Sequence, residues 1–120
     1  MRPVRPDERI VRNIVSAPYR PFKCEGTPCP GVSYLPIDDQ CQPGTGFHIF
    51  RMEPGAVSPA HEHTADEMFY VISGELIEND GTVFRQGDMV LLKAGTQHSS
   101  HTRDGCTLLV YVETLEIPLD

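Results

Sequence analysis

Short apolar runs alternate with turn-forming residues throughout the chain after residue 44. The runs are rich in Val, Ile, Phe, Tyr and Leu, which favour strands, and a break comes about every eight to twelve residues. None of the runs is long enough for a convincing amphipathic helix. The sequence NDG at 79–81 lies between two of them and is a strong hairpin signal. The pattern predicts an all-β antiparallel sandwich or barrel, with strands at FHIFRM (47–52), EMFYVI (67–72), LIE (76–78), TVFR (82–85), MVLLK (89–93) and CTLLVYVE (106–113).

The first part of the chain lacks this alternation and is interrupted by prolines at positions 3, 6, 18, 21, 28, 30, 36 and 43. With 120 residues, the chain can form one packed core but not two. We therefore expect residues 1–43 to form an irregular, proline-rich arm and residues 44–120 to form the barrel. Within the arm, RIVRNIVS (9–16) fits a short helix as well as a strand, and GVSYLPI (31–37) could also be regular.

Charge is distributed unevenly along the chain. Residues 1–23 carry six basic and two acidic side chains, whereas residues 24–120 carry four basic and fifteen acidic ones. The net charge of −7 argues against nucleic acid as a partner, because neutralising phosphates needs a basic face. The basic arm could lie on the acidic barrel, or on that of a partner subunit, or remain a solvated tail.

The sequence shows no membrane anchor and no zinc ribbon. No stretch approaches the roughly 20 apolar residues of a membrane helix, and no apolar segment follows the charged start. We therefore expect a cytoplasmic protein. Cys24 and Cys29 could form a disulfide or hold a metal, but in a reducing compartment we favour free thiols. Cys106 is expected to be a small core residue.

Three potential metal ligands lie within seven residues: His61, His63 and Glu67. Successive side chains of a strand point to opposite faces, so these three share parity and can point into one cavity. The turn-like TAD between them makes this argument firmer for the two histidines than for the glutamate. Imidazole nitrogen with carboxylate oxygen suits Fe, Mn, Co, Ni or Zn.

The residues from Gly55 to Gly74 read G-x5-H-x-H-x3-E-x6-G and resemble the first signature of the cupin family. The segment 87–102, GDMVLLKAGTQHSSHT, resembles the second signature, with His98 at the ligand position. Two non-ligand positions differ, since Lys93 stands where the family usually has proline and Thr102 where it usually has asparagine. The closer resemblance is to the cupin lobe of photooxidative-stress anti-sigma factors and to diketone-cleaving dioxygenases.

This resemblance implies a double-stranded β-helix, or jelly-roll barrel, in which His61, His63, Glu67 and His98 surround one divalent transition metal. Iron is favoured, because the open-site arrangement resembles that of 2-His-1-carboxylate iron enzymes. Two of six coordination positions would remain for water, substrate or O2. Glu67 would then alternate between metal ligand and catalytic general base.

Strand parity also predicts what surrounds the site. We expect His48 and Phe50 to face inward, since an inward Arg51 would need a partner for its charge, and Phe69 and Val71 to line the cavity with Glu67. The opposite face of that strand carries Met68, Tyr70 and Ile72, which a second subunit could cover; we therefore expect a homodimer. His101, with parity opposite to His98, should be exposed.

Two functions fit these features. The first is a metal-dependent oxygenase, or a related isomerase or lyase, acting on a small organic molecule through the open metal positions. Because the barrel has few cations, a neutral or chelating oxygen compound fits better than a sugar phosphate. The alternative is a non-catalytic module that binds a metal or ligand and reports it to a partner. The fold alone does not choose between them.

Overall fold

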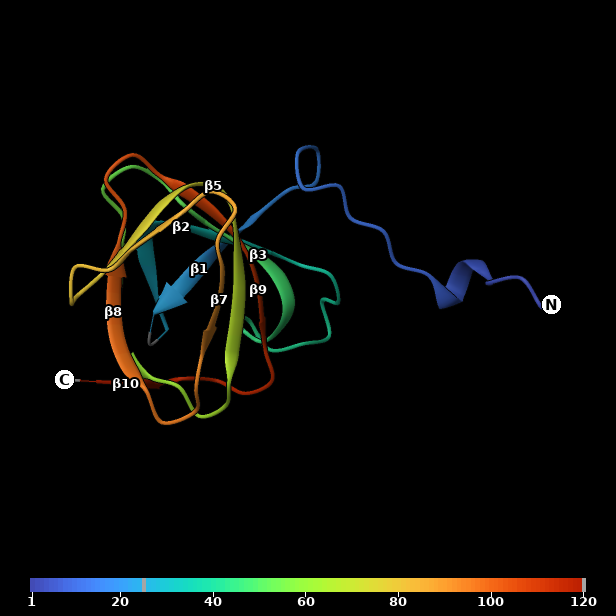
Figure 1. The fold of residues 1–120 in the computed structure, drawn as a ribbon. Helices are drawn as coiled ribbons and strands as arrows, with labels where there is room; N and C mark the ends of the chain where they lie inside the picture. Colours follow the sequence, from blue (N-terminus) through green and yellow to red (C-terminus); the bar gives the residue numbers. More distant parts are fainter. Residues whose placement is uncertain (25, 120) are drawn as a thin grey trace.

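The chain folds as a curled antiparallel sheet that wraps around a single interior (Figure 1). The computed structural model describes residues 1–24 and 26–119, and within them there is no α-helix, only one short 3-10 turn, η1 (Pro6–Glu8). The predicted all-β jelly-roll barrel is therefore confirmed. Its strands are β1 (Arg20–Cys24), β2 (Thr27–Pro36), β3 (Gly46–Met52), β4 (Val57–Glu62), β5 (Glu67–Glu78), β6 (Val83–Arg85), β7 (Met89–Leu92), β8 (Gln97–His101), β9 (Cys106–Val112) and β10 (Ile117–Pro118).

Strand β5 belongs to both layers of the barrel. Its first half lies between β9 and β7, where Phe69 pairs with Val110 and with Val90. Its second half pairs with β6 and β8, where Ile77 lies opposite Val83 and His101. The register shifts after Val71, so the two runs predicted at 67–72 and 76–78 form one bent strand.

Gly74 allows this bend. Its φ of 79° lies in the left-handed region that favours glycine, and a Cβ there would overlap the carbonyl oxygen of Gly105. Immediately after the second half of β5, the predicted NDG hairpin leads into β6. The Glu78 amide donates to the Thr82 carbonyl at 2.9 Å, which closes this hairpin.

The sheet begins within the segment that the sequence analysis assigns to the arm. Strands β1 and β2 form a hairpin, and the second half of β2, from Val32 to Pro36, pairs with β3. Pro21 is tolerated because β1 is an edge strand. RIVRNIVS is neither helix nor strand, and the chain before β1 extends away from the barrel (Figure 1).

Cys24 and Cys29 are joined by a disulfide across the β1–β2 hairpin, so the expectation of free thiols is wrong in this structure. The antiparallel turn brings their Cα atoms to 5.5 Å, a separation that a disulfide spans. The hairpin brings the two thiols together whatever the compartment, which is why the compartment alone does not predict the bond. Among the described residues, Cys41 and Cys106 are free, and Cys106 is buried as expected.

Arg51 faces away from the interior and contacts the base of the arm. Its guanidinium lies 3.7 Å from the centre of the Tyr19 ring and donates to the Ile14 carbonyl at 3.3 Å. Its strand neighbours His48 and Met52 are buried on the other face. The inward face of β3 is therefore the one that avoids burying an unpaired arginine.

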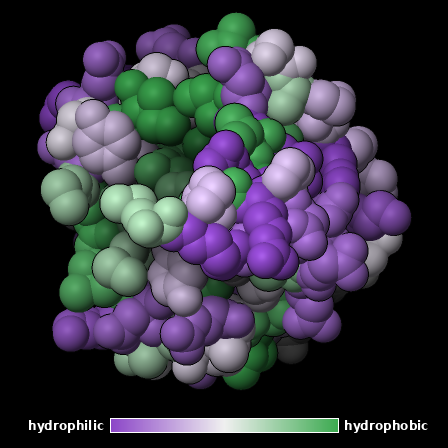
Figure 2. All heavy atoms as spheres, turned by 90° about the vertical axis from the view of Figure 1, so that its right-hand side faces the viewer, coloured by the Kyte–Doolittle hydropathy of each residue, from purple (hydrophilic) through white to green (hydrophobic). Residues whose placement is uncertain are grey.

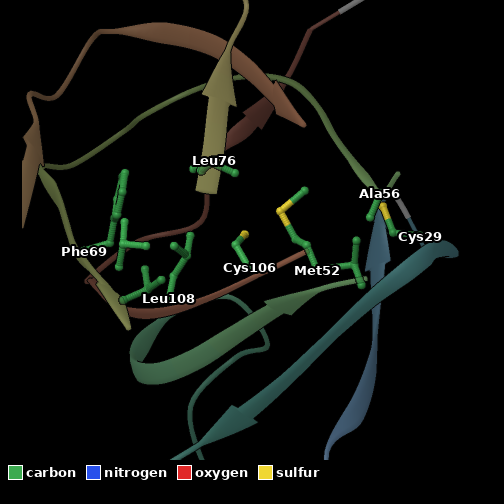
Figure 3. Close-up of a cluster of buried hydrophobic side chains, with 10 residues drawn as sticks. Cys29, Met52, Ala56, Phe69, Leu76, Cys106 and Leu108 are labelled. Atoms are coloured by element: carbon green, nitrogen blue, oxygen red, sulfur yellow. The ribbon is translucent and has the colours of Figure 1, made fainter. Parts of the chain in front are cut away.

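The core is an apolar cluster that Figure 3 shows between the two layers of the barrel. Val71 is completely buried in it and Met52 is 2% exposed. We call this set of residues the apolar cluster: Cys29, Val32, Met52, Ala56, Phe69, Val71, Leu76, Cys106, Leu108 and Val110.

Large hydrophobic side chains also remain on the outer face of the layer that β3, β9, the first half of β5 and β7 form. Phe47 lies opposite Tyr111, which lies opposite Met68, and Tyr70 lies opposite Met89. These residues and Leu91, opposite Met68, are all exposed, and we call them the outer apolar face. Figure 2 shows hydrophobic side chains gathered on the surface beside a hydrophilic area.

Among the described residues, no helix has the length and apolar character needed to span a bilayer.

Candidate metal centre

Three histidine rings, two from paired strands and one from the residue that follows β4, meet inside the barrel. His61 and His98 lie opposite each other in the β4–β8 ladder, and His63 follows β4 directly. The Nε2 atoms of His61 and His98 are 3.0 Å apart. Ring nitrogens of all three residues lie within 4.8 Å of one another. With Glu67, which begins β5, these residues form what we call the donor cluster.

Hydrogen bonds fix the proton of each ring on Nδ1. The Pro59 carbonyl lies 2.8 Å from His61 Nδ1, and the Glu78 carboxylate 2.8 Å from His98 Nδ1; both oxygens can only accept. The Thr96 hydroxyl lies 3.0 Å from His63 Nδ1.

The Thr96 hydroxyl donates its proton to the Lys93 carbonyl at 2.7 Å, so it must accept from Nδ1 of the His63 ring. Each neutral ring therefore presents the lone pair of its Nε2 to the others, which is the tautomer of a metal-binding histidine.

The donor set fits a divalent transition metal. His63 Nε2 is buried and has no hydrogen-bond partner among residues 1–24 and 26–119. Neutral His61 and His98 rings would point two lone pairs at each other over 3.0 Å, which a metal ion or a proton between them relieves. Glu67 Oε1, 3.6 Å from His63 Nε2, adds an anionic oxygen. Three imidazoles and a carboxylate suit Fe, Mn, Co, Ni or Zn.

A third carboxylate, Glu116, reaches the cluster from the segment between β9 and β10. Its Oε2 lies 2.9 Å from His61 Nε2, and its side chain is 37% exposed. The sequence analysis identified neither this residue nor Glu78 and Thr96, which orient two of the rings. No sequence signal marks Glu116, because the two-residue strand that places it is too short to predict.

The carboxylates also shift the histidine pKa values. Burial lowers the pKa of His61, but the hydrogen bond and charge of Glu116, with the Pro59 carbonyl and Glu67, outweigh burial and raise it above its ordinary value. Burial likewise lowers the pKa of His48, and there the opposing groups are too weak to reverse it. His48 is therefore neutral at pH 7 and donates from Nδ1 to the Gly46 carbonyl at 3.0 Å.

The donor cluster borders a cavity of about 50 Å³, which admits an ion with a few waters or a very small molecule. His48, Phe50 and Phe69 are among the residues that line it. Val71 packs into the apolar cluster. The full lining is Phe22, Gly44, His48, Phe50, Met52, Ser58, His61, Glu67, Phe69, Leu76, His98, Ser100, Leu108, Val110 and Glu116.

No lysine or arginine among the described residues belongs to this lining. Two serine hydroxyls, from Ser58 and Ser100, are its neutral polar groups. His101 is exposed on the opposite face of β8, as strand parity predicted. The site is therefore a small chamber with anionic and neutral polar groups on an apolar wall.

Comparisons with known proteins place this site in context. The ChrR cupin-like domain matches residues 7–116, and no curated protein matches the chain. An acetylacetone dioxygenase from Acinetobacter johnsonii is similar in structure, with a TM-score of 0.71 and 14% identity over 93% of this chain and 80% of that one.

Two further solved structures are similar. One is the complex of SigE with the anti-sigma ChrR from Rhodobacter sphaeroides, with a TM-score of 0.62 and 17% identity over 82% of this chain. The match spans half of that chain. The other is the polyketide cyclase RemF from Streptomyces resistomycificus, with a TM-score of 0.61 and 18% identity over 77% of this chain and 73% of that one. Likeness at these identities shows the fold alone.

Proposed function

The chain belongs to the ChrR cupin-like domain family, and we propose that it is a metal-dependent oxygenase, or a related isomerase or lyase, acting on a small organic molecule. One divalent transition metal, iron by preference, would be held by His61, His63, Glu67 and His98. The observation that carries this proposal is the convergence of three imidazoles and one carboxylate beside a cavity that His61, Glu67 and His98 line. A metal held there would supply Lewis acidity and a template for substrate oxygens.

The surrounding residues support a neutral substrate. The nearby charges are the carboxylates of Glu67 and Glu116, and no cation among the described residues lines the cavity. An anionic compound such as a sugar phosphate would meet repulsion there, whereas an uncharged oxygen compound would find hydroxyl groups and an apolar wall. The similarity to an acetylacetone dioxygenase agrees with a small oxygen chelator as substrate.

Glu67 is the residue we assign to proton transfer. Its carboxylate lines the cavity, and its side chain is 14% exposed. A carboxylate that borders both the metal ligands and the substrate space can take a proton from a bound C–H or O–H acid. Neutral His48 can orient the substrate within the same space.

The test combines metal analysis with O2 uptake. The protein, purified without a tag and reloaded with Fe²⁺ under anaerobic conditions, would be given a panel of diketones, thiols and phenols. We expect one metal per chain and O2 uptake with at least one uncharged oxygen chelator. Full iron occupancy with no uptake on any compound would contradict the oxygenase.

The binding-module alternative has a specific observation in its favour. A cavity of about 50 Å³ is small for a substrate, and the family is described by ChrR, an anti-sigma in the complex with SigE. A module of this kind would bind the metal tightly and show no turnover. The O2-uptake experiment therefore separates the two functions.

We also propose a homodimer formed through the outer apolar face. Met68 and Leu91 lie opposite each other on this face, and 47% and 49% of their respective surfaces are exposed. Contiguous apolar surface of this kind is commonly covered by a partner. Light scattering should give twice the chain mass, and Met68→Glu with Leu91→Glu should give a monomer; a wild-type monomer would contradict the proposal.

A further inference from the structure

We infer that Glu116 is a fifth protein ligand of the metal, and that a chelating substrate must displace it. This inference rests on the metal centre proposed above. It concerns a residue outside both sequence signatures, contributed by the segment that follows the last long strand.

The first argument is the position of the Glu116 carboxylate. Its Oε2 lies 2.9 Å from His61 Nε2, the atom that is also 3.0 Å from His98 Nε2. A Glu116 oxygen also lies within 4.8 Å of a His63 ring nitrogen and a Glu67 oxygen. Glu116 therefore shares the space of the donor cluster rather than lying beside it.

The second argument is the arrangement of acceptor atoms around His61 Nε2. His61 Nδ1 donates to the Pro59 carbonyl, so the neutral ring presents a lone pair from Nε2 to the Glu116 carboxylate. Two acceptors facing each other at this distance need a cation between them, and the same holds for the His61–His98 contact. A single metal ion bound by the three groups satisfies both contacts at once.

The third argument is that backbone contacts hold Glu116 in place from both sides. On one side, the Thr64 hydroxyl donates to the Leu115 carbonyl at 2.6 Å. On the other side, β10 pairs with β4, where Ile117 lies opposite Glu62 and the Leu119 amide donates to the Ala60 carbonyl at 3.0 Å. The segment is thus tied to the strand that carries His61.

The consequence is a change in the number of coordination positions on the metal that the protein leaves open. Four protein ligands leave two positions of a six-coordinate ion, which is what a bidentate chelator needs, whereas five leave one. The Glu116 side chain is 37% exposed, so it can swing toward solvent while the backbone stays in place. Glu116 would then protect the resting metal and yield its position to a substrate with two oxygen donors.

The experiment compares Glu116→Ala with Glu113→Ala, which removes an exposed carboxylate from the same segment. Co²⁺ affinity is measured by competition with a chelating dye, and exchangeable waters are counted by water-proton relaxation of the Mn²⁺-loaded protein. For Glu116→Ala we expect Co²⁺ affinity to fall about tenfold or more, by analogy with the 10- to 100-fold losses on removing supporting groups of metal sites. We expect one additional exchangeable water, while Glu113→Ala matches the wild type.

A second readout separates a ligand from a merely structural residue. Acetylacetone binding to the Co²⁺-loaded protein should become tighter in Glu116→Ala, because no carboxylate has to leave. A structural role would weaken metal and chelator binding together. If the alanine variant does not fold, Glu116→Gln keeps the size of the side chain, and we expect a smaller loss of Co²⁺ affinity with the same tighter chelator binding.

The outcomes distinguish this inference from the proposed function. If the wild-type protein binds Co²⁺ and both Glu116 variants match it in affinity, water count and chelator binding, Glu116 is not a ligand. The proposed metal centre would still stand in that case. A wild-type protein that binds neither Co²⁺ nor Mn²⁺ would overturn both.

Discussion

The donor cluster and the apolar cluster occupy the same barrel interior, yet they are held in place by different forces. Glu67 and Val71 lie on the same face of β5, one in each cluster. Val71 is positioned by packing alone and depends on volume. The donor histidines are oriented by hydrogen bonds that their Nδ1 atoms donate to the Pro59 carbonyl, the Thr96 hydroxyl and the Glu78 carboxylate. Stability should therefore depend on volume in one cluster, and metal affinity on hydrogen bonds in the other.

The largest expected effect is on stability, from Val71→Ala. Removing part of a fully buried side chain should lower the free energy of unfolding by about 1.5–3 kcal/mol, measured by urea denaturation with a chelator present. The control is Val57→Ala, a strand residue with 53% exposure, which should cost less than about 1 kcal/mol. Equal costs would show that the apolar cluster does not determine stability.

The next largest effect is expected at Glu78, the hydrogen-bond partner of His98. Glu78→Ala should weaken metal binding by about 10- to 100-fold, because the ring loses the acceptor that fixes its tautomer. Glu75→Ala is the matched control, since this residue of the same strand pairs with the exposed Arg103 at 3.0 Å. The measurement is competition with a chelating dye. Equal metal affinities in the two variants would show that the hydrogen bond to His98 does not determine metal affinity.

A smaller loss is expected at His63. Thr96→Val keeps the shape of the side chain but removes the hydroxyl that accepts from Nδ1. A neutral hydrogen bond contributes about 0.5–1.5 kcal/mol, so metal affinity should fall about two- to tenfold. The same dye competition measures it. A loss larger than that of Glu78→Ala would reverse the ranking that charge-assisted bonds predict.

The smallest perturbation is chemical labelling of the two free thiols. Burial raises the pKa of Cys106 to about 11, so its thiolate is scarce at pH 8, whereas Cys41 is exposed. Mass spectrometry after brief iodoacetamide treatment should find Cys41 modified first. Labelling of Cys106 should increase as the pH approaches its pKa, because the thiolate is the nucleophile. Equal early labelling would mean that the apolar cluster is open to solvent.

The two clusters also differ in how far the sequence predicted them. Strands with apolar inward faces, such as β3 and β9, were predicted nearly to the residue. Strands β4 and β8 were not, because their inward positions carry His61, His98 and Ser100 in place of apolar residues. The chemistry that makes the site removes the alternation that identifies a strand.

The ligands were visible in the spacing of His61, His63 and Glu67, but their supporting residues were not. Glu78 faces the site only because the register shift in β5 changes which side chains point inward. Glu116 depends on a two-residue strand. The disulfide depends on a hairpin that lay within a segment expected to be irregular. Each of these needs a tertiary register, which a single sequence does not contain.

The central claim is that ligands from both sequence signatures converge on one ion. The most direct test is the metal content of His61→Ala and His98→Ala after reloading, measured by mass spectrometry beside His101→Ala, the exposed control on β8. We predict a loss of at least about tenfold in both variants with the fold retained, since each removes an imidazole ligand. Metal content equal to that of the wild type in both would contradict the account.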